Sequence, residues 1–149
     1  MKLFQIEEPD GGPVDPAAGG AAIGVDASGA VVEVAFSVGG NALVLVDREG
    51  FEQVLRVPSR AAEQTEWQAV FEAARIRAER ALARPVTHAV IVLADVSDAE
   101  TALRIRSAAE GAGFQVLRIA AAAELSDPTT ALAAAMLAED LVPPPERGG

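Results

Sequence analysis

The chain of 149 residues contains no cysteine and only one histidine, His88. The absence of cysteine excludes disulfides, thiolate metal sites and cysteine nucleophiles, and it is compatible with a reducing compartment. With a single histidine, one chain cannot assemble a histidine-based metal cage or a catalytic triad. These kinds of centre are therefore excluded, and His88 is expected simply to enter a strand.

Aromatic residues are also scarce, at 4% of the chain, although half of the residues are hydrophobic. The core must therefore be built from alanine, valine, leucine and isoleucine, which lets backbones approach one another closely. A chain of this size buries roughly two-thirds of the surface that it exposes when unfolded. We therefore expect one domain with a proper core.

Basic residues are in the minority, because 12 lysines and arginines stand against 22 aspartates and glutamates, for a net charge of −10. This balance disfavours a general attraction to nucleic acid or to an anionic membrane. No apolar run approaches the roughly 18 residues of a membrane span, and no basic segment followed by an apolar one opens the chain. We expect a soluble, cytoplasmic protein with neither nucleic acid nor membrane as its partner.

Composition divides the chain into three parts. Residues 1–20 are rich in glycine, proline and aspartate and predict a flexible N-terminal arm, in which a short apolar patch (Leu3, Phe4 and Ile6) either docks or frays. Residues 21–141 predict a single domain. The proline-rich remainder, 142–149, is typical of a disordered tail.

The first half of the domain shows the pattern of an antiparallel sheet. Apolar runs at 21–26 and 31–36, joined by a tight turn, predict a hairpin. Residues 42–46 predict a third strand. The alternation at 51–57 indicates a half-exposed edge strand.

A long amphipathic helix is predicted from about Thr65 to Leu82. Its apolar residues recur at the spacing of one helical face, and Thr65 with Gln68 forms a candidate capping box. Trp67 and Phe71 lie one turn apart on this face. We interpret these two aromatic residues as core anchors and not as a stacking platform.

The segment 87–119 has the pattern of a βαβ unit. The β-branched run at 89–94 predicts a parallel strand covered on both faces, and 114–119 predicts a second one. Ser97 and Glu100 form a candidate capping box for the intervening helix. Residues 120–126 are compatible with a helix or a loop, and Asp127 followed by proline predicts the start of a last helix that runs to about residue 140.

In order, the predicted elements are βββ(β)αβαβα, an antiparallel group followed by a parallel pair with helices. This order matches the ribonuclease-H-like fold that actins, sugar kinases and heat-shock ATPases share. The predicted fold class is therefore α/β, of the ribonuclease-H-like or actin-like βββαβαβα kind, with a mixed sheet and helices on both faces.

Residues 65–135 resemble the first lobe of the nucleotide-binding domain of DnaK-type, seventy-kilodalton heat-shock chaperones. Residues 79–92, ERALARPVTHAVIV, are similar to the family's helix and strand that end in a VTKAVITVPA-like segment. The stretch at 108–119, AAEGAGFQVLRI, is similar to its A-x-x-A-G-L-x-V-L-R-I motif, and DPTTALAA at 127–134 to its E-P-T-A-A-A helix start. The resemblance also covers IGVD at 23–26, which is similar to the family's first strand, I-G-I-D.

The departures from the family concern its nucleotide-binding parts. Where the family has a Gly-Thr-Thr phosphate loop, Asp26 is followed here by Ala-Ser-Gly-Ala, with Ser28 as the only hydroxyl. The family's catalytic lysine belongs to a subdomain inserted after the third strand, but residues 57–64 contain no lysine. The family's second lobe and its peptide-binding domain have no counterpart. The resemblance therefore implies a fold without independent ATP hydrolysis.

Three functions follow from these observations. The leading hypothesis is a non-catalytic, truncated chaperone-like module, without a cofactor, that acts in protein–protein interaction or scaffolding with itself or with a full-length chaperone. The alternative is a residual ATP and Mg²⁺ binder, completed by a second chain, in which Asp26, Ser28 and Asp127 bind the cofactor. The third is a nuclease of the ribonuclease-H-like kind that binds two divalent ions through Asp26, Asp95 and Asp127. The simpler interpretation is that Asp26 is an exposed acid that caps a turn, and that Asp95 caps the next helix.

Overall fold

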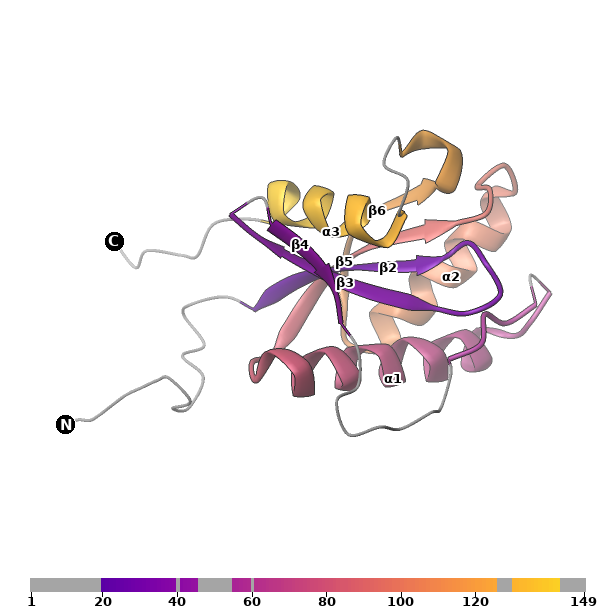
Figure 1. Cartoon of the computed structure of the whole chain (residues 1–149). Coiled ribbons are helices and arrows are strands. Elements are labelled where there is room, and N and C mark those ends of the chain that lie inside the picture. Colours follow the sequence, from indigo (N-terminus) through magenta and orange to yellow (C-terminus); the bar gives the residue numbers. More distant parts are fainter. Residues whose placement is uncertain (1–19, 40, 46–54, 60, 126–129, 143–149) are drawn as a thin grey trace, which may run out of the picture.

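The computed structural model describes residues 20–39, 41–45, 55–59, 61–125 and 130–142. The elements follow the predicted order of strands and helices (Figure 1). They are β2 (Ala21–Ala27), β3 (Glu33–Val38), β4 (Asn41–Val44), α1 (Gln64–Leu82), β5 (Val86–Leu93), α2 (Ala99–Gly111), β6 (Gln115–Ala121), η2 (Ala122–Glu124) and α3 (Thr130–Leu141).

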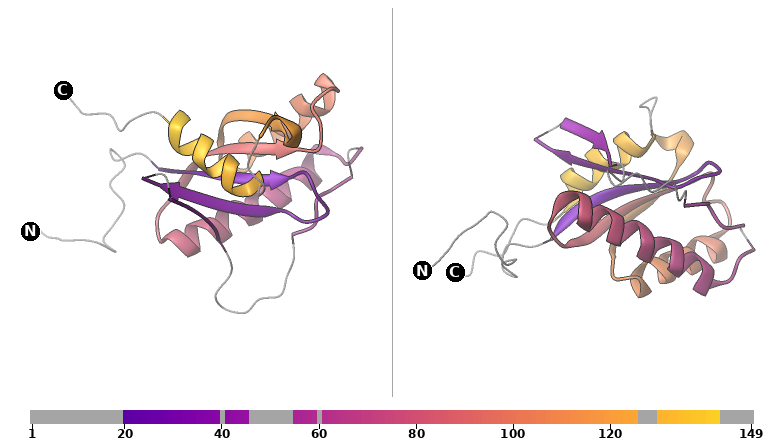
Figure 2. Two further views of the ribbon diagram at one scale, coloured as in Figure 1. Left: turned by 45° about the horizontal axis from the view of Figure 1, so that its top comes forward. Right: turned by 60° about the horizontal axis from the view of Figure 1, so that its bottom comes forward.

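The strands form one mixed sheet in the order β4-β3-β2-β5-β6. The hairpin partners β2 and β3 are antiparallel, as are β3 and β4. The other two pairs, β2 with β5 and β5 with β6, are parallel. Figures 1 and 2 show α3 on one face of this sheet and α1 and α2 on the other. The predicted α/β class is confirmed, and the arrangement is consistent with an actin-like, ribonuclease-H-like fold.

The larger core lies between the sheet and the α1/α2 layer. Ile23 and Val25, on alternate positions of β2, are fully buried there with Ile91 of β5. Trp67 and Phe71 of α1 enter the same core, and their ring centroids are 5.9 Å apart. The prediction that these two aromatic residues are core anchors is confirmed.

The opposite face is covered by α3, whose buried residues are all alanines. These small side chains let the helix lie close to the sheet, and β2 presents Gly24 at the point of contact. A Cβ atom on Gly24 would lie 2.4 Å from the backbone nitrogen of Ala135. Glu139 ties the far end of α3 to the β3–β4 turn, because its carboxylate accepts from the Ser37 hydroxyl at 2.7 Å and from the Gly39 amide at 2.5 Å.

Several predicted boundaries differ from the structure. The second strand begins at Glu33 instead of residue 31, because Val32 pairs elsewhere: its amide donates to the Leu55 carbonyl at 2.7 Å. The predicted strand at 51–57 lies outside the described residues up to residue 54, and its remainder forms a single bridge, Val31 with Arg56. The passage after residue 119 continues β6 to residue 121 and then forms the short η2.

Both predicted capping boxes are wrong. Helix α1 starts after Glu63 without a side-chain cap, so Thr65 is already inside the helix. The cap of α2 is Asp98, one residue after Ser97: its carboxylate accepts from the Glu100 amide at 3.2 Å and from the Thr101 hydroxyl. These hydrogen bonds, with that to Thr101 foremost, lower the pKa of Asp98.

Some predictions fall outside the described residues. They concern the apolar patch of the N-terminal arm, Asp127 as a helix cap and the tail beyond residue 142. Among the described helices, none combines the length and the apolar character that crossing a bilayer requires.

Candidate functional site

The carboxyl ends of the parallel strands β2 and β5 lie side by side, since Ala27 pairs with Leu93. Of the residues predicted for an ATP and Mg²⁺ site, the structure brings Asp26 and Ser28 together here. One carboxylate oxygen of Asp26 accepts from the Ser28 amide at 2.9 Å and from the Ser28 hydroxyl at 2.5 Å. Asp127, the third residue of that prediction, lies outside the described residues.

The second carboxylate oxygen of Asp26 accepts a hydrogen bond from the hydroxyl of Thr130, the first residue of α3. Asp26 thus joins the turn after β2 to the helix that covers the sheet. The prediction that Asp26 caps a turn is confirmed, but the prediction that it is exposed is wrong, because it is only 9% exposed. No local pattern points to Thr130, because its contact with Asp26 spans 104 positions of the chain.

Asp95, named for the nuclease hypothesis, follows β5 and is exposed. Its carboxylate accepts from the Ser97 amide at 3.1 Å and from the Ser97 hydroxyl at 2.9 Å, so it caps the turn before α2 and not α2 itself. Asp95 lines a pocket at the strand ends together with Ser28, whereas the Asp26 carboxylate is bound to Ser28 and to Thr130 of α3. Within the described ranges, no group of three or more acidic or histidine side chains could hold a metal ion.

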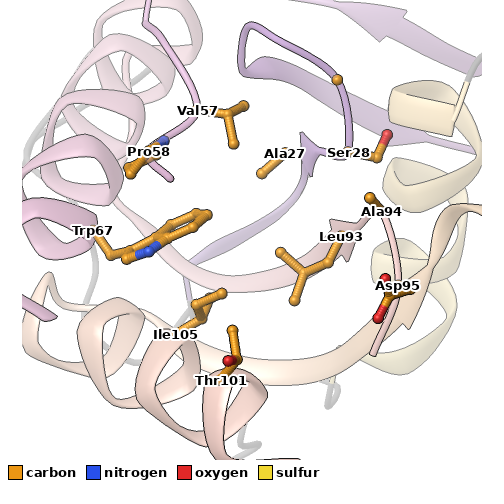
Figure 3. Close-up of a pocket in the computed structure, with 11 residues that line it drawn as sticks. Ala27, Ser28, Val57, Pro58, Trp67, Leu93, Ala94, Asp95, Thr101 and Ile105 are labelled. Atoms are coloured by element: carbon orange, nitrogen blue, oxygen red, sulfur yellow. The ribbon is translucent and has the colours of Figure 1, made fainter. Parts of the chain in front are cut away.

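A pocket of about 230 Å³ lies on the α1/α2 side of the same strand ends. Its walls come from five separate segments: the turn after β2, the stretch before α1, the end of β5, helix α1 and helix α2 (Figure 3). The lining residues are mostly apolar and are Ala27, Ser28, Gly29, Val57, Pro58, Trp67, Leu93, Ala94, Asp95, Thr101 and Ile105. The sequence does not predict this pocket. Its lining residues share no local motif, and only the tertiary fold brings them together.

Trp67, which lines this pocket, has a buried polar atom in its side chain. Its indole Nε1 is buried and has no hydrogen-bond partner in the described part of the chain. A buried donor without an acceptor costs about 1–3 kcal/mol. Figure 3 shows the indole ring along one side of the pocket, with its nitrogen on the edge nearer to Ile105.

His88 lies inside β5, as predicted. Its Nδ1 is 2.7 Å from the Thr87 hydroxyl. Burial lowers the pKa of His88 by desolvation. These features are those of a strand residue and add no chemistry to the strand ends.

No family model matches this chain, and no curated protein matches it. The α/β class therefore rests on the chain's own topology. The resemblance to DnaK-type chaperones stays a prediction from the sequence.

Proposed function

We propose that this chain is a non-catalytic module, resembling the first lobe of a heat-shock ATPase, that binds another protein. The hydrogen bonds of Asp26 support the proposal that the module is non-catalytic. Both oxygens of this carboxylate are used to hold Ser28 and Thr130, so the acid serves the fold. In the chaperone-like interpretation, the same acid would instead orient a metal-bound water.

The proposal that the chain binds another protein rests on an open groove between α2 and β6. It has a volume of about 460 Å³ and is lined by Val96, Ala99, Ala102, Leu103, Arg106, Leu117, Arg118 and Ile119. Leu103 is 63% exposed, the highest fraction among the exposed large hydrophobic residues described. Apolar surface beside a groove is typical of a protein interaction site.

The groove suits a partner that binds through side chains. β6 is an edge strand of the sheet, but it carries a bulge: Val116 pairs with Ala89 and Arg118 with Val90, which leaves Leu117 as an extra residue. Bulges at edges interrupt regular pairing and protect against the addition of a further strand. We therefore propose that the partner inserts apolar side chains beside Leu103 instead of extending the sheet.

The charge of the groove indicates the composition of that partner. The chain as a whole has a net charge of −10, yet the charged groups that line the groove are two arginines, Arg106 and Arg118. Arg118 pairs with Glu124 at 2.9 Å in an exposed ion pair, which a competing carboxylate can replace at little cost. The proposed occupant is an apolar segment of another protein that carries acidic residues.

Substitution of Leu103 by glutamate should weaken partner binding at least about tenfold, because it places a charge on the apolar contact and cancels the positive groove. The matched control is Ile76→Glu, since Ile76 is 48% exposed on α1 and lies outside the groove. The measurement is quantitative capture from the native cell with all three tagged proteins, followed by titration of the recovered partner against each.

The proposal is supported by a partner that binds the unmodified chain and Ile76→Glu but not Leu103→Glu. Added salt should weaken the binding of that partner. A partner that binds Leu103→Glu equally well contradicts the groove. Recovery of nothing but a second copy of this chain would replace the partner with self-association and contradict the charge argument.

The alternative, an ATP and Mg²⁺ site completed by a second chain, draws its support from the proximity of Asp26 and Ser28. Against it stands the engagement of that carboxylate with Thr130, which a metal-bound water would have to displace. The described residues around the strand ends also offer no lysine for the phosphates, because the sole lysine of the chain is Lys2.

A further inference from the structure

The groove between α2 and β6 has a chemistry that one segment of this same chain matches. Residues 3–10 read LFQIEEPD, so three apolar side chains are followed by three acids. The groove has the complementary features. Leu103 and Leu117 supply apolar surface, and the charged side chains that line it are Arg106 and Arg118. An apolar segment with acidic residues is therefore the occupant that this lining favours.

The register of the sheet places the groove close to the point where the described chain begins. Gly24 of β2 pairs with Val90, and Val90 pairs with Arg118 of β6, so Arg118 is level with Gly24 at a distance of two strands. Gly20 precedes Gly24 by four positions. With about 3.3 Å per residue along a strand and about 4.8 Å between strands, the span from Gly20 to Arg118 is about 16 Å.

The linker between the segment and the sheet has the length that this span requires. Asp10 and Gly20 are ten positions apart, and the intervening residues, GGPVDPAAG, include three glycines. A flexible linker of about ten residues has a mean end-to-end distance of about 17 Å. The effective concentration of a tethered segment is highest when this distance matches the span. Docking within one chain is therefore favoured over docking of the same segment from a second copy.

The exposed apolar surface on the β3–β4 hairpin suits this segment less well. Val38 and Leu43 are the exposed large hydrophobic residues there. The adjoining turn binds an acid, because the Glu139 carboxylate accepts from the Gly39 amide. An acidic segment would meet like charge at this turn, whereas it would meet two arginines in the groove.

We propose that residues 3–10 dock in the α2–β6 groove of their own chain, with the apolar side chains against Leu103 and Leu117 and the acids facing Arg106 and Arg118. The docked segment occupies the site proposed for the partner, so it competes with that protein and lowers its apparent affinity. This regulation rests on the proposed function, whereas the docking itself is measured without a partner.

The absence of cysteine allows a direct test on the full chain. Lys2→Cys provides a single attachment point for a nitroxide spin label beside the segment. The label should broaden the amide signals of Ala102, Leu117 and Ile119 in a proton–nitrogen correlation spectrum, and chemical reduction of the nitroxide should restore them. Because the contact lies within one chain, the broadening should be independent of protein concentration.

Substitutions on the two sides of the contact provide the controls. In the labelled chain, Leu103→Glu should lower the docking equilibrium constant at least about tenfold, because it places an acid opposite the acidic segment. Phe4→Ser should also weaken docking. Ile76→Glu, on the exposed surface of α1 outside the groove, should leave the broadening unchanged. Added salt should reduce the broadening, because it screens the contact between acids and arginines.

The recovered partner provides the second measurement. Phe4→Ser should bind it at least about threefold more tightly than the unmodified chain does, because the competing segment no longer fills the groove. Broadening that centres on Val38 and Leu43, that depends on protein concentration, or that persists unchanged in Leu103→Glu overturns the proposal.

The outcomes separate this inference from the proposed function. A partner that binds the groove, in a chain whose spin label leaves the signals of α2 and β6 unchanged, would keep the proposed function and overturn the docking. Broadening of the groove signals in a chain that captures no other protein would support the docking and contradict the proposed function.

Discussion

Replacing Gly24 by alanine should lower the free energy of unfolding by about 3 kcal/mol, at the upper end of what overpacking costs in a closely packed core. The added Cβ would lie 2.4 Å from the Ala135 nitrogen and 2.7 Å from the Ala134 carbonyl carbon. Both are backbone atoms of α3, so no side chain can turn away to make room. The helix itself must move off the sheet.

The matched control is Gly29→Ala, because nothing lies within 4 Å of a Cβ atom built there. Urea unfolding monitored through the fluorescence of Trp67 gives the free energy of unfolding of all three proteins. The control should remain within about 0.5 kcal/mol of the unmodified chain. Equal stability of the Gly24 variant would show that α3 does not lie against β2 as described.

Replacing Asp26 by alanine should cost about 2–3 kcal/mol of stability. The change leaves the Ser28 amide and the hydroxyls of Ser28 and Thr130 without their acceptor at a site that is only 9% exposed. It also releases the first residue of α3 from the strand. Asp26→Asn should lower the stability less than Asp26→Ala does, because the amide keeps one oxygen as an acceptor.

Asp140→Ala is the matched control, since Asp140 is an exposed acid near the end of the same helix. Its removal should leave stability unchanged or slightly raised, because an acid at a helix C-terminus is unfavourable. The measurement is urea unfolding at neutral pH and fixed ionic strength. An Asp26→Ala protein as stable as the unmodified chain would contradict the structural role of this carboxylate.

The order of strands and helices was predictable because periodicity is a local signal. The continuous apolar run of β5 predicted a strand buried on both faces, and the helical spacing of Trp67 and Phe71 predicted a core face. Caps were less predictable. Asp98 and Ser97 are both good capping residues one position apart, and backbone geometry selected the aspartate.

The site was harder to predict, because its contacts join distant parts of the chain. Asp26 was identified as an acid at a strand end, but its burial depends on α3, whose first residue is 104 positions away. The same holds for the pocket: Ser28, Trp67 and Ile105 share no motif, and only the sheet order brings them together. Local patterns predict elements, whereas tertiary packing decides which polar atoms remain available.

We infer that Asp26 and its neighbours hold the fold together and do not bind a nucleotide. Calorimetric titration of the intact protein with ATP in the presence of Mg²⁺ tests it most directly, with Asp26→Asn as the parallel sample. We expect no heat of binding from either protein. Micromolar binding by the unmodified chain that Asp26→Asn abolishes would contradict the account.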